Sequence, residues 1–189
     1  MPAAPRLDRD ASLLLVVDVQ TRLAPHVEAH EALIMRAGAL LDAAHRFAIP
    51  RRLTEHCAEQ IGPVVPILRE RFATDEIFAK TRFGAADHPE FTAALRSTGR
   101  TQIVIAGMEA HVCAMQTSLG LIERGFAVFA VTDALGSRAA RRDDRRMALE
   151  RLRAAGAVLT ATETVLFEWT RDGTDPAFRD VLALVKRLP

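Results

Sequence analysis

Three residues whose side chains can do covalent or acid–base chemistry each follow a short, largely apolar segment. Asp18 follows residues 13–17, Lys80 follows residues 77–79, and Cys113 comes soon after residues 102–106. A thiol attacks a carbonyl carbon readily only when a base takes its proton or a nearby cation stabilises its thiolate. A carboxyl group and an ammonium group supply these two functions. The residue types therefore predict a cysteine nucleophile served by Asp18 and Lys80.

The neighbourhood of Cys113 strengthens this interpretation. Residues 102–106 are typical of a buried strand and residues 114–124 of a helix, so Cys113 lies between the end of a strand and the start of a helix. Backbone N–H groups and the positive end of a helix dipole favour a thiolate at such a position. The alternative is that Cys113 packs as a small apolar residue. Lys80 favours the catalytic interpretation. Apart from Lys80 and Lys186, all the residues counted as Lys or Arg are arginines, and lysine offers a compact ammonium whose pKa can be tuned.

The elements that must position these residues alternate along the chain. Largely apolar segments typical of strands are separated by segments with helical periodicity. The expected strands are 13–18, 49–54, 76–80, 102–106, 127–132 and 157–160, and the expected helices are 31–47, 89–96, 114–124, 138–155, 162–169 and 175–188, with a brief helical turn at 64–70. Short apolar strands separated by helices predict an α/β fold with a parallel sheet covered on both faces. Ligands bind at the carboxyl ends of such strands, where Asp18, Lys80 and Cys113 all fall.

Length and composition limit the remaining possibilities. The 189 residues predict a single domain, 1–189, which can bury a core without disulfides. A formal net charge of +1 with 26% charged residues predicts no nucleic-acid or membrane partner. The N-terminus lacks the apolar core of a signal peptide, so we expect a cytoplasmic protein. Cys57 and Cys113, the two cysteines, fit neither a disulfide framework nor a zinc pattern.

Three sequence segments resemble the signature segments of the isochorismatase-like cysteine hydrolases. They are Val-Val-Asp-Val-Gln at 16–20, Phe-Ala-Lys-Thr-Arg-Phe-Gly-Ala at 78–85 and Gly-Met-Glu-Ala-His-Val-Cys at 107–113. Residues 133–138 and 162–168 are similar to the metal-free branches of that superfamily, so the resemblance covers nearly the whole chain. It implies a three-layer, Rossmann-like fold with a six-stranded parallel sheet flanked by helices on both faces. It also implies that Asp18, Lys80 and Cys113 form a catalytic triad.

The resemblance further implies an activity. We expect an isochorismatase-like amidohydrolase that cleaves a C–N bond of a small amide or carbamoyl-type substrate through a thioester on Cys113. Backbone N–H groups of Glu109 and Cys113 would form the oxyanion hole, with a cis peptide between Met108 and Glu109. Relatives of this kind are homo-oligomers, dimers or larger, so we expect the same here, with helix 114–124 or the Trp169 region as interface. Whether a neighbouring subunit completes the pocket, and which substrate binds, stay open.

Further residues are predicted to line the substrate pocket, and no metal or other cofactor is expected. The predicted pocket residues are Gln20, Leu23, His56, Phe83 and Met108. Nicotinamidase-type relatives hold a metal with an Asp-x-His pair after the second strand. Here Glu55, His56 and Cys57 are consecutive, and adjacent residues of a strand point to opposite faces. His56 with Cys57 remains open as an incidental metal site.

Other interpretations stay open at this stage. Cys57 and Cys113 could serve a thiol redox or stress-related protein if they approach within disulfide reach, and the chain could be a non-catalytic assembly member of the same fold. His111 near Cys113 suggests a Cys–His dyad, although a structural or pocket role is favoured. Glu109 could bind Arg82 or the substrate, while a carboxylate at a helix start is the simpler interpretation.

Overall fold

The computed structural model describes residues 6–189, and its centre is a parallel sheet. The described residues form six strands, and every pairing between them is parallel. The sheet order is β3-β2-β1-β4-β5-β6, and the strands are β1 (Ser12–Val17), β2 (Arg51–His56), β3 (Ile77–Lys80), β4 (Gln102–Met108), β5 (Ala127–Gly136) and β6 (Val158–Thr160). The predicted α/β fold with a six-stranded parallel sheet is confirmed.

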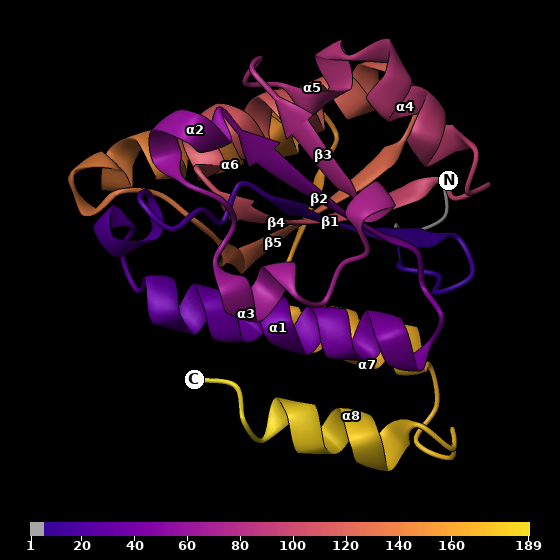
Figure 1. Ribbon diagram of the computed structural model, residues 1–189. Coiled ribbons are helices and arrows are strands. Elements are labelled where there is room, and N and C mark those ends of the chain that lie inside the picture. The colour runs from indigo at the N-terminus through magenta and orange to yellow at the C-terminus, as the bar shows by residue number, and fades with distance from the viewer. Residues whose placement is uncertain (1–5) are drawn as a thin grey trace.

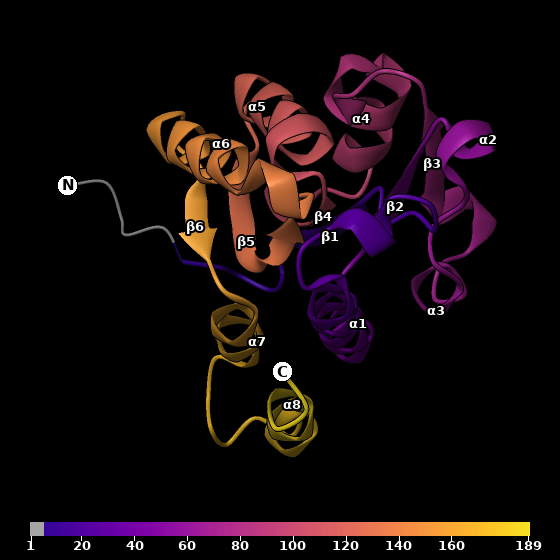
Figure 2. The ribbon, with the colours of Figure 1, turned by 90° about the vertical axis from the view of Figure 1, so that its left-hand side faces the viewer.

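Helices cover both faces of the sheet, as Figures 1 and 2 show. One layer holds α4 (Pro89–Arg96), α5 (Met115–Glu123) and α6 (Arg142–Ala154). The other holds α1 (His30–Arg46) and α7 (Thr162–Thr170), with α8 (Phe178–Val185) packed on their outer side. Two short helices, α2 (Ala58–Ile61) and α3 (Pro66–Arg69), lie between β2 and β3 in the chain.

The alternation of side chains along the strands divides the core into two parts. On β1, Leu14 and Val16 face the α1 side, whereas Leu13, Leu15 and Val17 face the α5 side. All of them are fully buried. Because both faces of each strand must be apolar, the central strands read as continuous apolar segments, which is the pattern that predicted the sheet.

Several boundaries differ from the prediction. Strand β2 runs to His56 and not to residue 54, and β5 continues to Gly136. Helix α6 begins at Arg142, because residues 139–141 form a separate turn of 3₁₀ helix, and α2 had no predicted counterpart. The extension of β2 matters most, since it places Thr54 and His56 on the same face of one strand.

Trp169 belongs to the core. Its side chain is fully buried, and its Nε1 donates a hydrogen bond to Oγ of Ser12 at 3.0 Å. The core role is therefore confirmed for Trp169 itself, and an interface in the region around it stays a prediction. None of the helices within residues 6–189 has the length and apolar character that crossing a membrane requires.

The strand order brings three carboxyl ends together. Strand β1 lies between β2 and β4, and the chain leaves the β3 side of the sheet to form β4 on the other side of β1. Parallel α/β sheets bind ligands where the order reverses in this way. Asp18 directly follows β1, Lys80 ends β3 and the segment containing Cys113 follows β4.

Candidate active site

Asp18 and Lys80 form a buried ion pair. The Nζ atom of Lys80 lies 2.6 Å from Oδ2 of Asp18, and their side chains are 0% and 1% exposed. Lys80 also donates to the carbonyl oxygens of Phe83 at 3.1 Å and Arg82 at 3.3 Å. These partners use the three donors of an ammonium group. The structure thus brings together two of the three residues singled out in the sequence, and Lys80 reaches its partner from beyond the intervening strand β2.

Thr54 holds the other oxygen of Asp18. Its hydroxyl donates to Oδ1 at 2.6 Å, and Thr54 is fully buried. Asp18 itself has φ 50°, a left-handed conformation that aspartate tolerates better than most residues. Sequence reasoning missed Thr54. The available signal was a hydroxyl in a strand whose preceding residue, Leu53, is apolar, but that signal does not identify the partner.

Cys113 completes the group. It lies in a single π-helical turn, Ala110–Ala114, that leads into α5, and its residue surface is 7% exposed. Asp18 and Lys80 are the two charged groups that act on the pKa of its thiol, so Cys113 lies close to the buried pair. Burial, followed by the charge of Asp18, raises the pKa of the Cys113 thiol to about 12, and Lys80 only partly opposes the rise. The expectation of a readily formed thiolate is therefore wrong for Cys113 in this structure.

The segment before Cys113 is held by its own ion pair. The peptide bond between Met108 and Glu109 is cis, as the resemblance implied. Oε1 of Glu109 accepts hydrogen bonds from Nε of Arg138 at 2.8 Å and from its backbone N–H at 3.2 Å. Glu109 thus binds Arg138, which sequence reasoning did not consider, and the suggested hydrogen bond to Arg82 is not found among the described residues. His111 contacts Ser137, with 2.9 Å between Nδ1 and Oγ, which gives it a structural partner.

Two of the predicted pocket residues, Gln20 and His56, are joined through the main chain. The Gln20 amide accepts from the N–H of His56 at 2.8 Å and donates to its carbonyl oxygen at 2.9 Å. Gln20 also donates to Gly62 at 2.5 Å and is fully buried. It therefore fixes the carboxyl end of β2 against the segment that follows β1.

His56 itself is close to the ion pair. Its ring centroid lies 5.1 Å from that of Phe83, which is half exposed. Burial and the nearby charge of Lys80 lower the pKa of the imidazole, and the charge of Asp18 opposes that shift. His56 and Phe83 thus lie beside the three central residues.

The remaining predicted pocket residues serve the core. Met108 is fully buried in the apolar core on the α1 face, and Leu23 packs against the same core. Cys57 and Cys113 are both free thiols, and Cys57 is half-buried. It lines a hollow of about 600 Å³ beside the ends of β2 and β3, together with Lys80 and His88. Within residues 6–189, no three His, Cys, Asp or Glu side chains gather in a way that could hold a metal ion.

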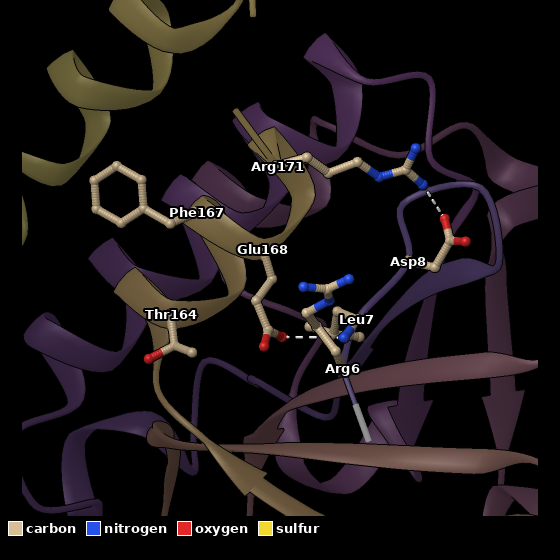
Figure 3. Close-up of a pocket in the computed structure, with 7 residues that line it drawn as sticks. All are labelled: Arg6, Leu7, Asp8, Thr164, Phe167, Glu168 and Arg171. Atoms are coloured by element: carbon tan, nitrogen blue, oxygen red, sulfur yellow. Dashed lines mark hydrogen bonds and ion pairs between the residues drawn. The ribbon is translucent and has the colours of Figure 1, made fainter. Parts of the chain in front are cut away.

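A larger hollow lies elsewhere on the molecule. It has a volume of about 770 Å³ and lies between residues 6–8 and helix α7 (Figure 3). Part of its polar lining is already paired: Arg171 binds Asp8, and Glu168 accepts from the N–H of Leu7 at 3.1 Å. Residues 6–8 lead into the amino end of β1, whereas Cys113 lies beyond the carboxyl end of β4. This hollow therefore lies at the opposite ends of the strands, and none of the predicted site residues line it.

Comparisons with known proteins agree with this geometry. The family model described as "Isochorismatase domain" matches residues 12–164. The chain resembles the MAR1 ribonuclease of Caenorhabditis elegans, with 33% identity and a TM-score of 0.90 over 98% of this chain and 95% of that one. It resembles YcaC of Pseudomonas aeruginosa, solved with hexane-2,5-diol and covalent acrylamide, with 34% identity and a TM-score of 0.88 over 95% and 91%.

The match to a third solved structure covers the full length of this chain and of that one. It is the YcaC gene product of Escherichia coli, described as an octameric hydrolase of unknown specificity, with 30% identity and a TM-score of 0.87 over 100% of each chain. The match of residues 12–164 spans most of the chain. The protein therefore belongs to the isochorismatase family.

Proposed function

We propose that the protein is a cysteine-dependent hydrolase that cleaves a C–N bond of a small amide or carbamoyl-type substrate. The observation that carries the proposal is a buried thiol close to a buried pair of a carboxyl group and an ammonium group, at the carboxyl ends of three strands. A buried ion pair stabilises a fold little compared with an apolar pair of similar volume. Its proximity to a thiol is better explained by chemistry than by stability.

The first half of the proposed reaction forms a thioester. The sulfur of Cys113 attacks the carbonyl carbon while Asp18 takes the thiol proton, and a C–S bond forms. Backbone N–H groups of Glu109 and Cys113 would bind the oxygen that becomes negative. The C–N bond then breaks, and the amine departs with the proton that Asp18 returns to it.

The second half releases the acid. Asp18 takes a proton from water, and the resulting hydroxide attacks the thioester carbon. The C–S bond breaks, the carboxylic acid leaves, and the thiol of Cys113 is restored with the proton held by Asp18. Lys80 keeps its positive charge beside Asp18 throughout and stabilises the negative charge that passes between sulfur and carboxylate.

The high pKa of Cys113 is compatible with this sequence of steps. A thiol with a pKa of about 12 is protonated at neutral pH, so a preformed thiolate is not the nucleophile. A base close to the thiol removes this difficulty, because the proton can move to Asp18 as the C–S bond forms. The proposal therefore assigns Asp18 the role of base rather than that of a mere partner for Lys80.

The structural neighbours suggest two directions. The covalent acrylamide in the Pseudomonas YcaC structure supports reactivity toward a small amide reagent in that protein. The name of the nematode protein raises RNA cleavage as a second possibility. Here Lys80, the cation of the site, is fully buried and already neutralised by Asp18, which makes it a poor partner for phosphate. We therefore favour an amide and include RNA in the test.

The test is a screen for ammonia release from primary amides, carbamoyl compounds and nicotinamide, with an RNA cleavage assay beside it. Cys113→Ala should abolish the release, whereas the matched control Cys57→Ala should retain it. Mass spectrometry of the intact protein should detect an acyl adduct on Cys113 during turnover. Unchanged ammonia release by Cys113→Ala would refute the covalent mechanism, and Cys113-independent RNA cleavage would favour the second activity.

We also propose that residues 1–189 form one domain and that the protein assembles as a homo-oligomer. The packing of α8 on α1 and α7 supports the first proposal, and the octamer described for the E. coli protein supports the second. Light scattering of the purified protein measures the assembly directly. A monomer at all accessible concentrations would refute the second proposal.

A further inference from the structure

His56 is fixed beside the proposed catalytic residues by the register of the sheet. Its Cα pairs with that of Lys80 on the neighbouring parallel strand, so both side chains leave the same face. Thr54, the residue that binds Asp18, lies two positions earlier on the same strand and therefore also on that face. The two hydrogen bonds between Gln20 and the main chain of His56 hold the backbone at this point.

One ring nitrogen of His56 lacks a partner. Nδ1 is shielded from solvent and makes no hydrogen bond to any atom of the described residues. A buried polar atom without a partner costs free energy, and such atoms in folded proteins require a reason. Burial and the charge of Lys80 lower the pKa of this imidazole, which favours the neutral ring. In the tautomer with its proton on Nε2, the Nδ1 atom accepts a hydrogen bond.

Phe83 lies on the solvent side of the His56 ring. Its ring packs against the His56 ring at 5.1 Å and is half exposed. Its carbonyl oxygen accepts a hydrogen bond from Nζ of Lys80 at 3.1 Å, which fixes the segment. A solvent-facing aromatic ring beside the imidazole offers a flat apolar face to a small planar group.

The charges around the site point in the same direction. Asp18 and Lys80 are the charged groups that act on both Cys113 and His56, and they already neutralise each other at 2.6 Å. A substrate carboxylate or ammonium group would lose its hydration beside a pair whose two charges already bind each other, which is costly. A neutral group that donates one hydrogen bond does not incur that cost.

We propose that Nδ1 of His56 accepts a hydrogen bond from the N–H of a neutral primary amide bound at Cys113, and that the Phe83 ring covers this amide. This inference rests on the proposed function and deepens it by naming the substrate class. The site then selects primary amides over esters and over amides without an N–H group, because a substrate without an N–H cannot pair with the unpartnered nitrogen.

The test uses three reagents that alkylate a thiol without requiring the natural substrate. Acrylamide has an amide N–H, whereas N,N-dimethylacrylamide and methyl acrylate have none. In each reaction the sulfur bonds to the terminal alkene carbon, the thiol proton ends on the adjacent carbon, and nothing is released. Rates at Cys113 are measured by mass spectrometry in the Cys57→Ala background and divided by the rates for free N-acetylcysteine.

The comparison needs two variants of His56. His56→Phe keeps an aromatic ring against Phe83 but removes the acceptor, and His56→Asn keeps an acceptor oxygen near the position of Nδ1. We expect the normalised preference for acrylamide over methyl acrylate to fall about tenfold in His56→Phe, the effect of one hydrogen bond. His56→Asn should restore most of the preference. The methyl acrylate rate is the internal control for an intact site.

The outcomes separate the inference from the proposed function. Alkylation of Cys113 with the same acrylamide preference in wild type and His56→Phe would overturn the inference alone. A wild-type protein that shows no preference relative to N-acetylcysteine would overturn it even if the His56 variants failed to fold. Absence of labelling at Cys113 by all three reagents would overturn the proposed nucleophile, and the inference with it.

Discussion

The Nζ atom of Lys80 and the Oδ2 atom of Asp18 lie 2.6 Å apart, although they come from strands that are not neighbours in the sheet. Strand β2 runs between β1 and β3, and Lys80 extends past it to reach Asp18. Thr54 on β2 binds the other oxygen of the same carboxyl group. Three strands thus contribute to holding one carboxylate, and Cys113, whose pKa this carboxylate raises, follows a fourth strand, β4.

Removing one member of this pair should destabilise the fold more than removing both. Lys80→Met leaves a buried carboxylate without its cation, and breaking such a pair costs about 3 to 5 kcal/mol. The double variant Asp18→Asn with Lys80→Met should recover much of that loss, because no charge stays unpaired. Urea unfolding measures both free energies. A double variant no more stable than Lys80→Met would contradict the expectation.

Asp18→Asn should separate the electrostatic role of Asp18 from its role as a base. Burial and then the charge of Asp18 raise the pKa of the Cys113 thiol to about 12, and Lys80 opposes the rise, so removing the carboxylate should lower that pKa. The thiolate would then form at lower pH while turnover falls, because the base is lost. The pH dependence of iodoacetamide labelling in the Cys57→Ala background measures the first effect. Labelling that needs an equal or higher pH would argue against this account.

The same pKa predicts how the wild-type protein responds to alkaline pH. A thiol whose pKa in the folded state is about 12, above its ordinary value of 9.0, binds its proton more tightly when the chain is folded. Its contribution to stability is complete below pH 9 and decreases as the pH rises toward 12. Cys113→Ala should weaken this alkaline loss of stability, as urea unfolding at several pH values would reveal. Equal pH slopes for the two proteins would count against the raised pKa.

Thr54→Val should damage turnover through the position of Asp18. Valine has nearly the shape of threonine but cannot donate the hydrogen bond to Oδ1, and a bond to a charged group contributes about 1.5 to 3 kcal/mol. We expect kcat to fall by about tenfold or more, with a smaller effect on KM. Thr54→Ser keeps the hydroxyl and is the matched control. Equal kcat values for the two variants would show that the hydroxyl has no positioning role.

Gly107→Ala tests the close approach of β4 to β1 beneath the site. Gly107 has φ +129°, and a Cβ atom there would overlap the carbonyl oxygen of Val17. We expect this variant to unfold or to lose soluble expression. Gly125→Ala is the control, since Gly125 also has positive φ but its Cβ would meet no described atom within 4 Å; it should cost only about 1 to 2 kcal/mol. Similar losses for both variants would exclude the steric explanation.

The sequence by itself determined the fold class and the residue types of the site. Alternating apolar and helical segments sufficed because a parallel sheet buries both faces of its strands, and this leaves a local pattern in the chain. Asp18, Lys80 and Cys113 were recognisable because reactive side chains at strand ends are also a local pattern. Their predicted convergence followed from topology, since parallel strands end at one edge of the sheet.

Only the tertiary structure decided what surrounds those residues. Thr54 and Arg138 were missed because their partners, Asp18 and Glu109, are distant in sequence. The pKa of Cys113 was misjudged because the largest cause of its rise is burial. Burial depends on how separate segments pack. The orientation of His56 toward the site likewise depends on where β2 ends and on its register with β3. Such properties belong to pairs of segments, and no single stretch of the chain encodes them.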